Sequence, residues 1–134
     1  MNKTILLIDD DEDELEIFQG ALKQVPFPIE CTQALSAEDG IKILENFKPD
    51  YIFVDYNMPR QNGLVCLEEL KKNDGISNVP IIIYSNYIDP EMEKKAMKLG
   101  ATLCMKKPFM TGILARKLKE IFTGELNPKG KRPS

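Results

Sequence analysis

The fold is decided by the stretch Tyr51-Ile52-Phe53-Val54-Asp55-Tyr56-Asn57-Met58-Pro59-Arg60-Gln61-Asn62-Gly63. Its four apolar residues predict a strand that is buried on both faces, and such strands are typical of parallel sheets covered by helices on either side. The strand ends at Asp55, and ligands of open α/β sheets bind at the carboxyl ends of the strands. The asparagines, proline and glycine that follow predict a turn.

Apolar runs and amphipathic patterns alternate along the rest of the chain. The other predicted strands are residues 5–8, 29–35, 79–84 and 102–105, and helical spacing of apolar residues covers 15–25, 41–47, 64–70, 90–99 and 113–122. The run 29–35 is mixed in polarity, which favours an edge position. Asp89 before Pro90 predicts a helix start and Gly100 a helix end, and Ser36 with Asp39 resembles an N-cap pair. Five alternations predict right-handed βαβ units and one parallel sheet between helical layers.

Composition limits the class of protein. The chain has 134 residues, 43% of them hydrophobic and 29% charged, as in one globular domain with a single core. We expect this domain to span residues 1–124, followed by a polar and mobile tail, 125–134. A net charge of -3 argues against nucleic-acid binding through bulk positive charge. The absence of a long apolar segment argues against membrane insertion and predicts a cytoplasmic protein.

The cysteines and the absence of histidine exclude several kinds of site. Cys31, Cys66 and Cys104 are widely spaced and odd in number, so neither a disulfide framework nor a zinc site is predicted. Because the chain contains no histidine, it lacks the commonest general base and cannot donate a phosphoryl group from phosphohistidine.

Polar residues follow several of the predicted strands abruptly. They are Asp9 and Asp10 after the first strand, Asp55 after the third, Ser85 after the fourth and Lys107 after the fifth. If the strands are parallel, these residues meet at one edge of the sheet. Carboxylates held this close repel one another unless a cation lies between them, and a hard divalent ion such as Mg²⁺ suits oxygen ligands.

The acidic run after the first strand also fits other interpretations. Taken alone, it is typical of a solvated helix N-cap, and Asp11 and Glu14 have capping-box spacing. The alternation of Asp9, Asp11 and Asp13 suits an EF-hand calcium loop. However, Glu14 stands where that loop needs glycine, and Gly20 stands where it needs a bidentate glutamate.

The ordered set of motifs resembles the receiver domain of two-component response regulators over roughly residues 3 to 123. The matching features are Asp9-Asp10 after a strand, Asp55 in its asparagine- and glycine-containing turn, Ser85 after Ile-Ile-Ile-Tyr, and Lys107-Pro108-Phe109. The resemblance implies a flavodoxin-like (βα)5 three-layer sandwich, with a five-stranded parallel sheet in the order 2-1-3-4-5.

The resemblance also implies roles for these residues. Asp55 would accept a phosphoryl group from a sensor histidine kinase, a phosphotransfer protein or acetyl phosphate. Asp10 would bind Mg²⁺ directly and Asp9 through water, with Asp55 and the backbone carbonyl of Asn57 completing the protein's metal ligands. Lys107 would pair with a phosphoryl oxygen.

Ser85 would hydrogen-bond a second phosphoryl oxygen and draw its loop inward. The Lys107–Pro108 bond would be cis. The protein would then be a switch of protein–protein contacts with an unidentified target, acting without an attached output domain, and would not be an enzyme in the turnover sense.

Two features depart from the family pattern. Cys104 stands where many receivers carry an aromatic switch residue, and Tyr84 or Tyr87 beside Ser85 could take over that role. Asn86 is larger than the usual residue at its position. Tyr87 could also shield the site from water, which would make loss of the phosphoryl group slow.

Two other functions are compatible with the same residues. Asp9 and Asp11 form a strand-end DxD like that of phosphohydrolases with an aspartyl-phosphate intermediate, which usually need a longer chain with a cap. A degenerate receiver that binds a partner without phosphorylation is the second alternative, and retention of the complete acidic, hydroxyl and lysine set argues against it.

Overall fold

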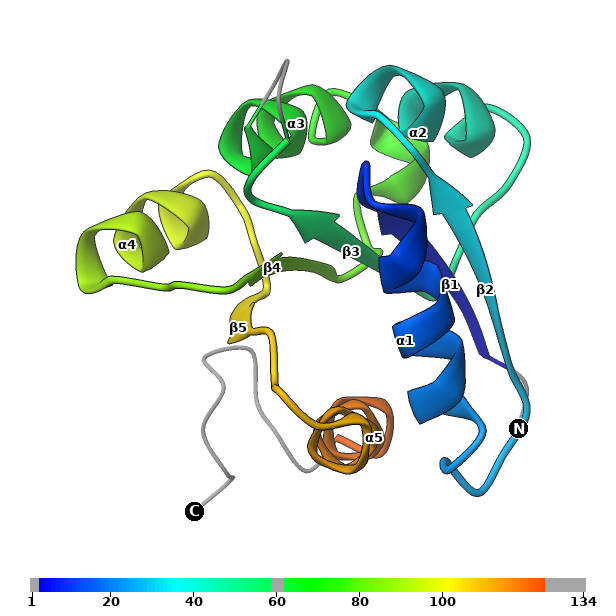
Figure 1. Cartoon of the computed structure of the whole chain (residues 1–134). Helices are drawn as coiled ribbons and strands as arrows, with labels where there is room; N and C mark the ends of the chain where they lie inside the picture. Colours follow the sequence, from blue (N-terminus) through cyan, green and yellow to red (C-terminus); the bar gives the residue numbers. More distant parts are fainter. Residues whose placement is uncertain (1–2, 59–61, 125–134) are drawn as a thin grey trace.

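The computed structural model describes residues 3–58 and 62–124, so the tail expected at 125–134 lies outside the described residues. Five strands alternate with five helices (Figure 1). The strands are β1 (Lys3–Ile8), β2 (Ile29–Ala34), β3 (Tyr51–Asp55), β4 (Ile81–Ser85) and β5 (Leu103–Lys106). The helices are α1 (Glu12–Leu22), α2 (Ala37–Leu44), α3 (Gly63–Leu70), α4 (Pro90–Lys98) and α5 (Thr111–Phe122).

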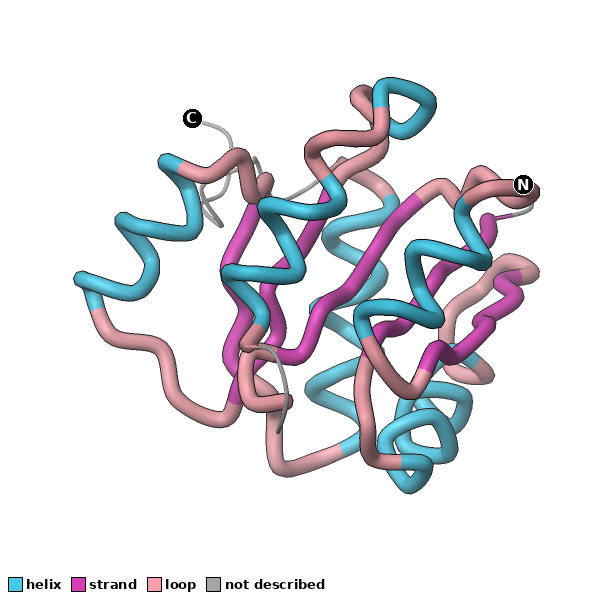
Figure 2. Tube along the Cα trace, turned by 90° about the horizontal axis from the view of Figure 1, so that it is seen from above, coloured by secondary structure: helices cyan, strands magenta, loops and turns pink. Residues whose placement is uncertain are grey.

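The strands form one parallel sheet in the order β2-β1-β3-β4-β5, which confirms the predicted topology. They lie side by side through the middle of the molecule (Figure 2). β2 lies at one edge, as its mixed polarity predicted, and β5 at the other. The register pairs Ile8 with Val54 and Asp55 with Tyr84, so β1, β3 and β4 reach the same edge of the sheet.

Two hydrophobic cores lie on the two faces of the sheet, because successive strand residues point to opposite sides. Leu6, Ile8, Ile52 and Val54 pack with residues of α2, α3 and α4. Ile5, Leu7, Phe53 and Tyr84 pack instead with residues of α1 and α5. The helices therefore form an outer layer on each side (Figure 1). Strands covered on both faces account for the continuous apolar runs of β1 and β3.

Side-chain caps fix where most helices begin. Ser36 Oγ accepts the Asp39 N–H, and Asp89 Oδ1 accepts the Met92 N–H with Pro90 at the first position of α4, as the sequence predicted. α5 begins at Thr111, earlier than its apolar pattern indicated, and Met110 before it gives no side-chain cap. β4 begins at Ile81, later than predicted.

Gly63 allows α3 to begin close against the end of β3. A Cβ atom on Gly63 would lie 2.8 Å from the carbonyl oxygen of Asp55 and 2.8 Å from the Cα of Tyr56. The Gly63 N–H donates to the Tyr56 carbonyl at 2.9 Å, which closes the turn after the strand. The glycine is therefore required by space at the edge where Asp55 lies.

Candidate functional site

The carboxyl edge of the sheet gathers the polar residues that the sequence singled out. Asp55 is the last residue of β3 and Ser85 the last of β4, whereas Asp9 follows β1 directly and Lys107 follows β5. Asp9 and Ser85 are fully buried and Asp55 is almost so, because each continues or adjoins a strand covered on both faces. The main chain links these ends, since the Lys107 N–H donates to the Ser85 carbonyl at 2.7 Å.

Three carboxylates form a cluster that could hold a metal ion. Asp9, Asp10 and Asp55 each offer one oxygen, and these oxygens lie within 4.8 Å of one another. Asp10 is exposed, whereas the other two are buried. Hard oxygen donors at this separation suit Mg²⁺ or a similar divalent ion. The Asn57 N–H donates to Asp55 Oδ1 at 3.3 Å, while the Asn57 carbonyl as a ligand stays a prediction.

Lys107 supplies the positive charge of the site. Its ammonium nitrogen lies 3.3 Å from Asp9 Oδ2, 3.2 Å from Asp55 Oδ1 and 3.3 Å from Glu14 Oε1. It also lies over the ring of Tyr84, 5.3 Å from the ring centroid. From its position after β5, the lysine thus bridges Asp9 after β1, Glu14 of α1 and Asp55 of β3.

Burial and charge shift the protonation equilibria of the site. Burial raises the pKa of Asp9 to about 6, although the Asp11 N–H and the Lys107 ammonium both oppose this rise. For Lys107, burial acts to lower the pKa. The carboxylates of Asp9, Asp55 and Glu14 together outweigh burial and raise it. Lys107 therefore stays charged at neutral pH, whereas the Asp9 carboxyl changes its protonation state near pH 6.

The hydroxyl of Ser85 is engaged by the loop that follows it. Ser85 Oγ donates to the Tyr87 carbonyl at 3.0 Å and accepts the Tyr87 N–H at 3.3 Å. In this structure, then, the hydroxyl holds the β4–α4 loop and makes no hydrogen bond to Asp55. Its expected role toward a phosphoryl group stays a prediction.

Glu14 is a member of the site that the sequence reasoning missed. Its spacing from Asp11 indicated a capping box, but Asp11 Oδ1 accepts the Asp13 N–H, and the Glu14 carboxylate reaches Lys107. Its position in the chain could have indicated this role, because the first turn of a helix that follows a strand lies at the same edge of the sheet as the end of that strand. Asp11 itself caps α1, and the three acids whose oxygens cluster are Asp9, Asp10 and Asp55.

The residues considered for the role of the aromatic switch residue differ sharply in exposure. Tyr84 is only 1% exposed and makes edge-on ring contacts with Phe18 and Phe53, at 5.7 Å and 6.1 Å between centroids. Tyr87 is 68% exposed. Cys104 is half-buried and packs against the core on the α2–α4 face, and burial raises the pKa of its thiol to about 11.

One expectation drawn from the family resemblance is wrong. The Lys107–Pro108 bond is trans, as are the other peptide bonds of the part of the chain that the structure describes. A proline only narrows the preference between the two isomers, so sequence alone does not decide it.

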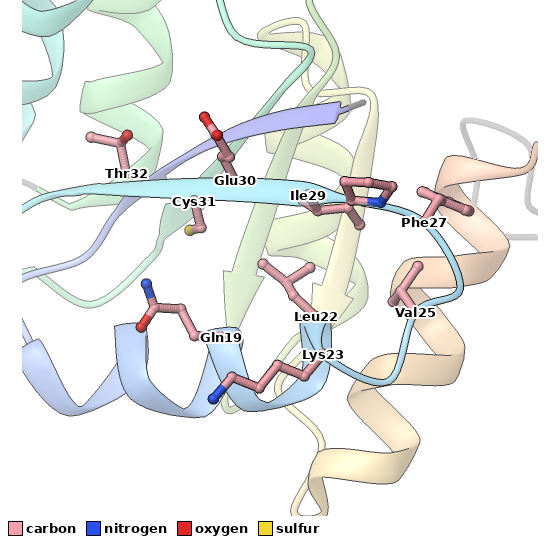
Figure 3. A pocket seen from close by; sticks show the side chains of 10 residues that line it. Gln19, Leu22, Lys23, Val25, Phe27, Ile29, Glu30, Cys31 and Thr32 are labelled. Carbon is pink, nitrogen blue, oxygen red and sulfur yellow. The ribbon is translucent and has the colours of Figure 1, made fainter. Parts of the chain in front are cut away.

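A groove lies away from this edge of the sheet, between α1 and β2 (Figure 3). Gln19, Leu22 and Cys31 point into it, whereas Glu30 and Thr32 point away on the other side of the strand. The groove contains none of the clustered acids, and burial raises the pKa of the Cys31 thiol to about 12, so it is not a reactive thiolate. The carboxyl edge is therefore the candidate functional site.

Known proteins resemble this chain in sequence and in fold. The family model for the response regulator receiver domain matches residues 5–119. Response regulator protein GraR from Staphylococcus aureus (strain JH9) is 31% identical over 121 residues, which is 88% of this chain and 50% of that protein. The chain thus spans about half the length of the curated relatives it matches.

Solved structures share the fold. The phosphorylated cyanobacterial phytochrome response regulator RcpA superposes with a TM-score of 0.78 at 22% identity, over 90% of this chain and 91% of that one. Chemotaxis protein CheY4 from Vibrio cholerae gives 0.78 at 20% identity, over 90% and 99%. The Mn²⁺-bound form of response regulator Rcp1 gives 0.76 at 20% identity, over 98% and 99%.

Within the described residues, none of the helices has the length and apolar character needed to cross a membrane. The extent of the family match, together with the fold, identifies the chain as a member of the response regulator receiver domain family of two-component signalling.

Proposed function

We propose that this receiver accepts a phosphoryl group on Asp55 from a histidine kinase or a phosphotransfer protein, with Mg²⁺ as cofactor, and that phosphorylation changes its contacts with a downstream protein. Receiver domains are phosphoacceptor switches and generally not enzymes. The observation that carries the proposal is the position of the Lys107 ammonium, 3.2 Å from Asp55 Oδ1 beside a cluster of three carboxylates.

The transfer step needs little covalent chemistry from the protein. A carboxylate oxygen of Asp55 attacks phosphorus, an O–P bond forms, and the bond between phosphorus and the leaving group breaks. With acetyl phosphate, acetate leaves with the electron pair, and with phosphohistidine, the imidazole does. Lys107 stabilises the negative charge on the equatorial oxygens of the phosphoryl group. Such charge stabilisation is the main way in which a protein accelerates phosphoryl transfer.

The donor set supports a divalent ion in the same site. Asp10, Asp55 and the Asn57 carbonyl would hold Mg²⁺, with Asp9 acting through water. The ion would neutralise charge on the carboxylates and on the phosphoryl oxygens. The Rcp1 structure, which has the same fold, is of a form bound to Mn²⁺, a metal of the same oxygen-preferring kind.

The switch would use Ser85 and its loop. In the structure the Ser85 hydroxyl is hydrogen-bonded to the main chain of Tyr87. Exchange of that partner for a phosphoryl oxygen would draw the β4–α4 loop toward Asp55. A shift from a mostly inactive to a mostly active population needs about 5 kcal/mol of differential stabilisation, and charge-assisted bonds from Ser85 and Lys107 can supply much of it.

A cytoplasmic location stays a prediction. Action without an attached output domain also stays a prediction, because the curated relatives extend well beyond the matched region.

Intact mass measurement after incubation with acetyl phosphate and MgCl₂ tests the proposal. We expect the wild-type chain to gain the mass of one phosphoryl group, and we expect no gain with Asp55→Asn or with EDTA in place of the metal. Asp39→Asn, which changes an exposed acid on α2, is the matched control and should behave as wild type. Modification of Asp55→Asn to the same extent as wild type, or none in the wild type, would refute the proposal.

A further inference from the structure

The ammonium group of Lys107 has as many carboxylate partners as it has hydrogens. An ammonium carries three donors, and Asp9, Asp55 and Glu14 each place one oxygen 3.2 to 3.3 Å from its nitrogen. The lysine side chain is only 10% exposed, so water has little access to replace a lost partner. Each of the three contacts therefore contributes to where the ammonium lies.

The three partners differ in what else the site asks of them. Asp9 and Asp55 belong to the carboxylate cluster that could hold a metal ion, and Asp55 is the proposed phosphoacceptor. Glu14 is outside that cluster. When a metal ion and a phosphoryl group are bound, the oxygens of Asp9 and Asp55 must also contact those groups. The Glu14 carboxylate has no such second role, so it stays available to Lys107.

We propose that Glu14 is a positioning residue that holds the Lys107 ammonium in place while a phosphoryl oxygen replaces a carboxylate as its partner. This inference rests on the proposed function, because it concerns how that site accepts a phosphoryl group. Glu14 does not touch the reacting atoms. It acts through Lys107.

The local structure keeps Glu14 in position for this role. It lies in the first turn of α1, where the partial positive charge of the helix N-terminus favours a carboxylate. Its N–H donates to the Asp11 carbonyl at 3.1 Å, so its main chain is fixed beside the end of β1. The side chain is 15% exposed and faces the lysine, whereas Glu12 in the same turn is exposed.

The ammonium is confined from a further side by Tyr84. The nitrogen lies 5.3 Å from the centroid of that buried ring, which attracts a cation to its face. Removal of Glu14 leaves the ring in place but opens the side toward α1. The ammonium would then spend less time beside Asp55, and a donor molecule would meet it less often in a productive arrangement.

The experiment compares phosphorylation rates with acetyl phosphate and MgCl₂ by time-resolved intact mass. We expect Glu14→Ala and Glu14→Met, which offer no acceptor oxygen, to react about tenfold more slowly, the scale of one hydrogen bond to a charged group. Glu14→Gln keeps an acceptor oxygen without the charge, so it should recover to within about threefold of wild type. Glu12→Ala removes the same charge from the same turn and should change the rate by less than about twofold.

A second measurement uses the metal-free, unphosphorylated protein. In ¹⁵N-labelled protein at mildly acidic pH, we expect the side-chain ammonium signal of Lys107 to be visible in wild type and Glu14→Gln and lost to solvent exchange in Glu14→Ala. The spectrum of Lys107→Arg identifies this signal, because the Lys107 ammonium signal is missing from that variant. A role of Glu14 in folding stability alone would lower the melting temperature without moving the rate or this signal.

The outcomes separate the two proposals. A wild-type chain that takes no phosphoryl group overturns the proposed function, and this inference falls with it. A wild type that is phosphorylated while Glu14→Ala and Glu14→Met match or exceed its rate overturns this inference alone, and a faster rate would identify Glu14 as a competitor of the phosphoryl group for Lys107.

Discussion

Asp9 and Lys107 form an ion pair of 3.3 Å across the carboxyl edge of the sheet, although they are 98 residues apart in the chain. The pair does not keep Asp9 acidic, because burial of the carboxylate outweighs the attraction and the pKa of Asp9 rises to about 6. The ionised carboxylate is therefore a cost to the fold in the absence of a metal. This is the pattern expected of a site that is arranged for ligand binding and not for stability.

The first prediction is a pH dependence of stability that comes from Asp9. Its pKa is raised from 3.8 to about 6 in the folded protein. The contribution of the Asp9 carboxyl to the free energy of unfolding is therefore fully present below about pH 3.8 and is lost as the pH rises through 6. The loss amounts to about 3 kcal/mol when complete. In metal-free buffer, Asp9→Asn should thus be as stable as wild type near pH 4 and more stable at pH 8, by up to about 3 kcal/mol.

Urea unfolding at several pH values, with EDTA present, measures this difference. Comparison of the variant with wild type at each pH cancels the titration of the other groups. A stability difference that does not change with pH would contradict the assignment of the raised pKa to Asp9.

The second prediction concerns the metal. Mg²⁺ should raise the free energy of unfolding of the wild type, by about 2.7 kcal/mol at one hundred times its dissociation constant. The gain should be smaller at pH 5 than at pH 8, because Asp9 takes up a proton across that range. Asp10→Ala should abolish the gain while changing the metal-free stability little, since Asp10 is exposed.

Thermal unfolding with and without MgCl₂ provides the measurement. Glu38→Ala, which removes an exposed acid from α2, should keep the full response to Mg²⁺. An equal response in Asp10→Ala would place the ion elsewhere.

The third prediction separates the two tyrosines beside Ser85. Tyr84 lies within the aromatic cluster with Phe18 and Phe53, so Tyr84→Ala should lower the free energy of unfolding by about 3 to 5 kcal/mol. Tyr87 is largely exposed, and Tyr87→Ala should change it by less than about 0.5 kcal/mol. Tyr84 is then part of the fixed support beneath Lys107, which leaves Tyr87 as the tyrosine that is free to report phosphorylation.

Chemical denaturation of both variants decides between them, and exchange of amide hydrogens in residues 86–89 before and after phosphorylation follows the loop. Similar stability losses in the two variants would show that Tyr87 is also part of the packed structure.

The fold was predictable because two independent patterns agree along the chain. Apolar runs of strand length alternate with helical spacing, and turn residues separate them, so only a parallel sheet with helices on both faces buries every run. The acids and the lysine were predictable for the same reason, since parallel strands deliver their carboxyl ends to one edge. The face that a strand residue takes was less predictable, because β4 is buried on both sides and its apolar run has no period.

Side-chain partners were the part that the sequence did not determine. Glu14 has the spacing of a capping box with Asp11, yet its carboxylate binds Lys107 from the opposite end of the chain. That choice depends on how α1 lies on the sheet, which is a result of packing between α1 and α5. Ser85 likewise was expected to hydrogen-bond a phosphoryl group, and in the structure its hydroxyl donates to the Tyr87 carbonyl of its own loop.

The last prediction concerns the closeness of the helix and the strand at the site. A methyl group on Gly63 would lie 2.8 Å from the Asp55 carbonyl oxygen and from the Tyr56 Cα. Both are backbone atoms, which cannot rotate out of the way as a side chain can. Gly63→Ala should therefore move the start of α3 or the end of β3, lower the free energy of unfolding by about 1 to 3 kcal/mol, and slow phosphorylation because Asp55 moves with its strand.

Gly112→Ala is the matched control, because a Cβ there would meet only Gln24 Oε1, at 3.9 Å. In α5 this change should leave the stability equal or raise it by about 0.5 to 1 kcal/mol, since alanine favours a helix over glycine. Urea unfolding and the rate of reaction with acetyl phosphate measure both variants. If Gly63→Ala matched Gly112→Ala in both, the tight approach of α3 to β3 would have no part in holding Asp55, and the turn would depend on Asn62, whose Oδ1 accepts the Leu64 and Val65 N–H groups.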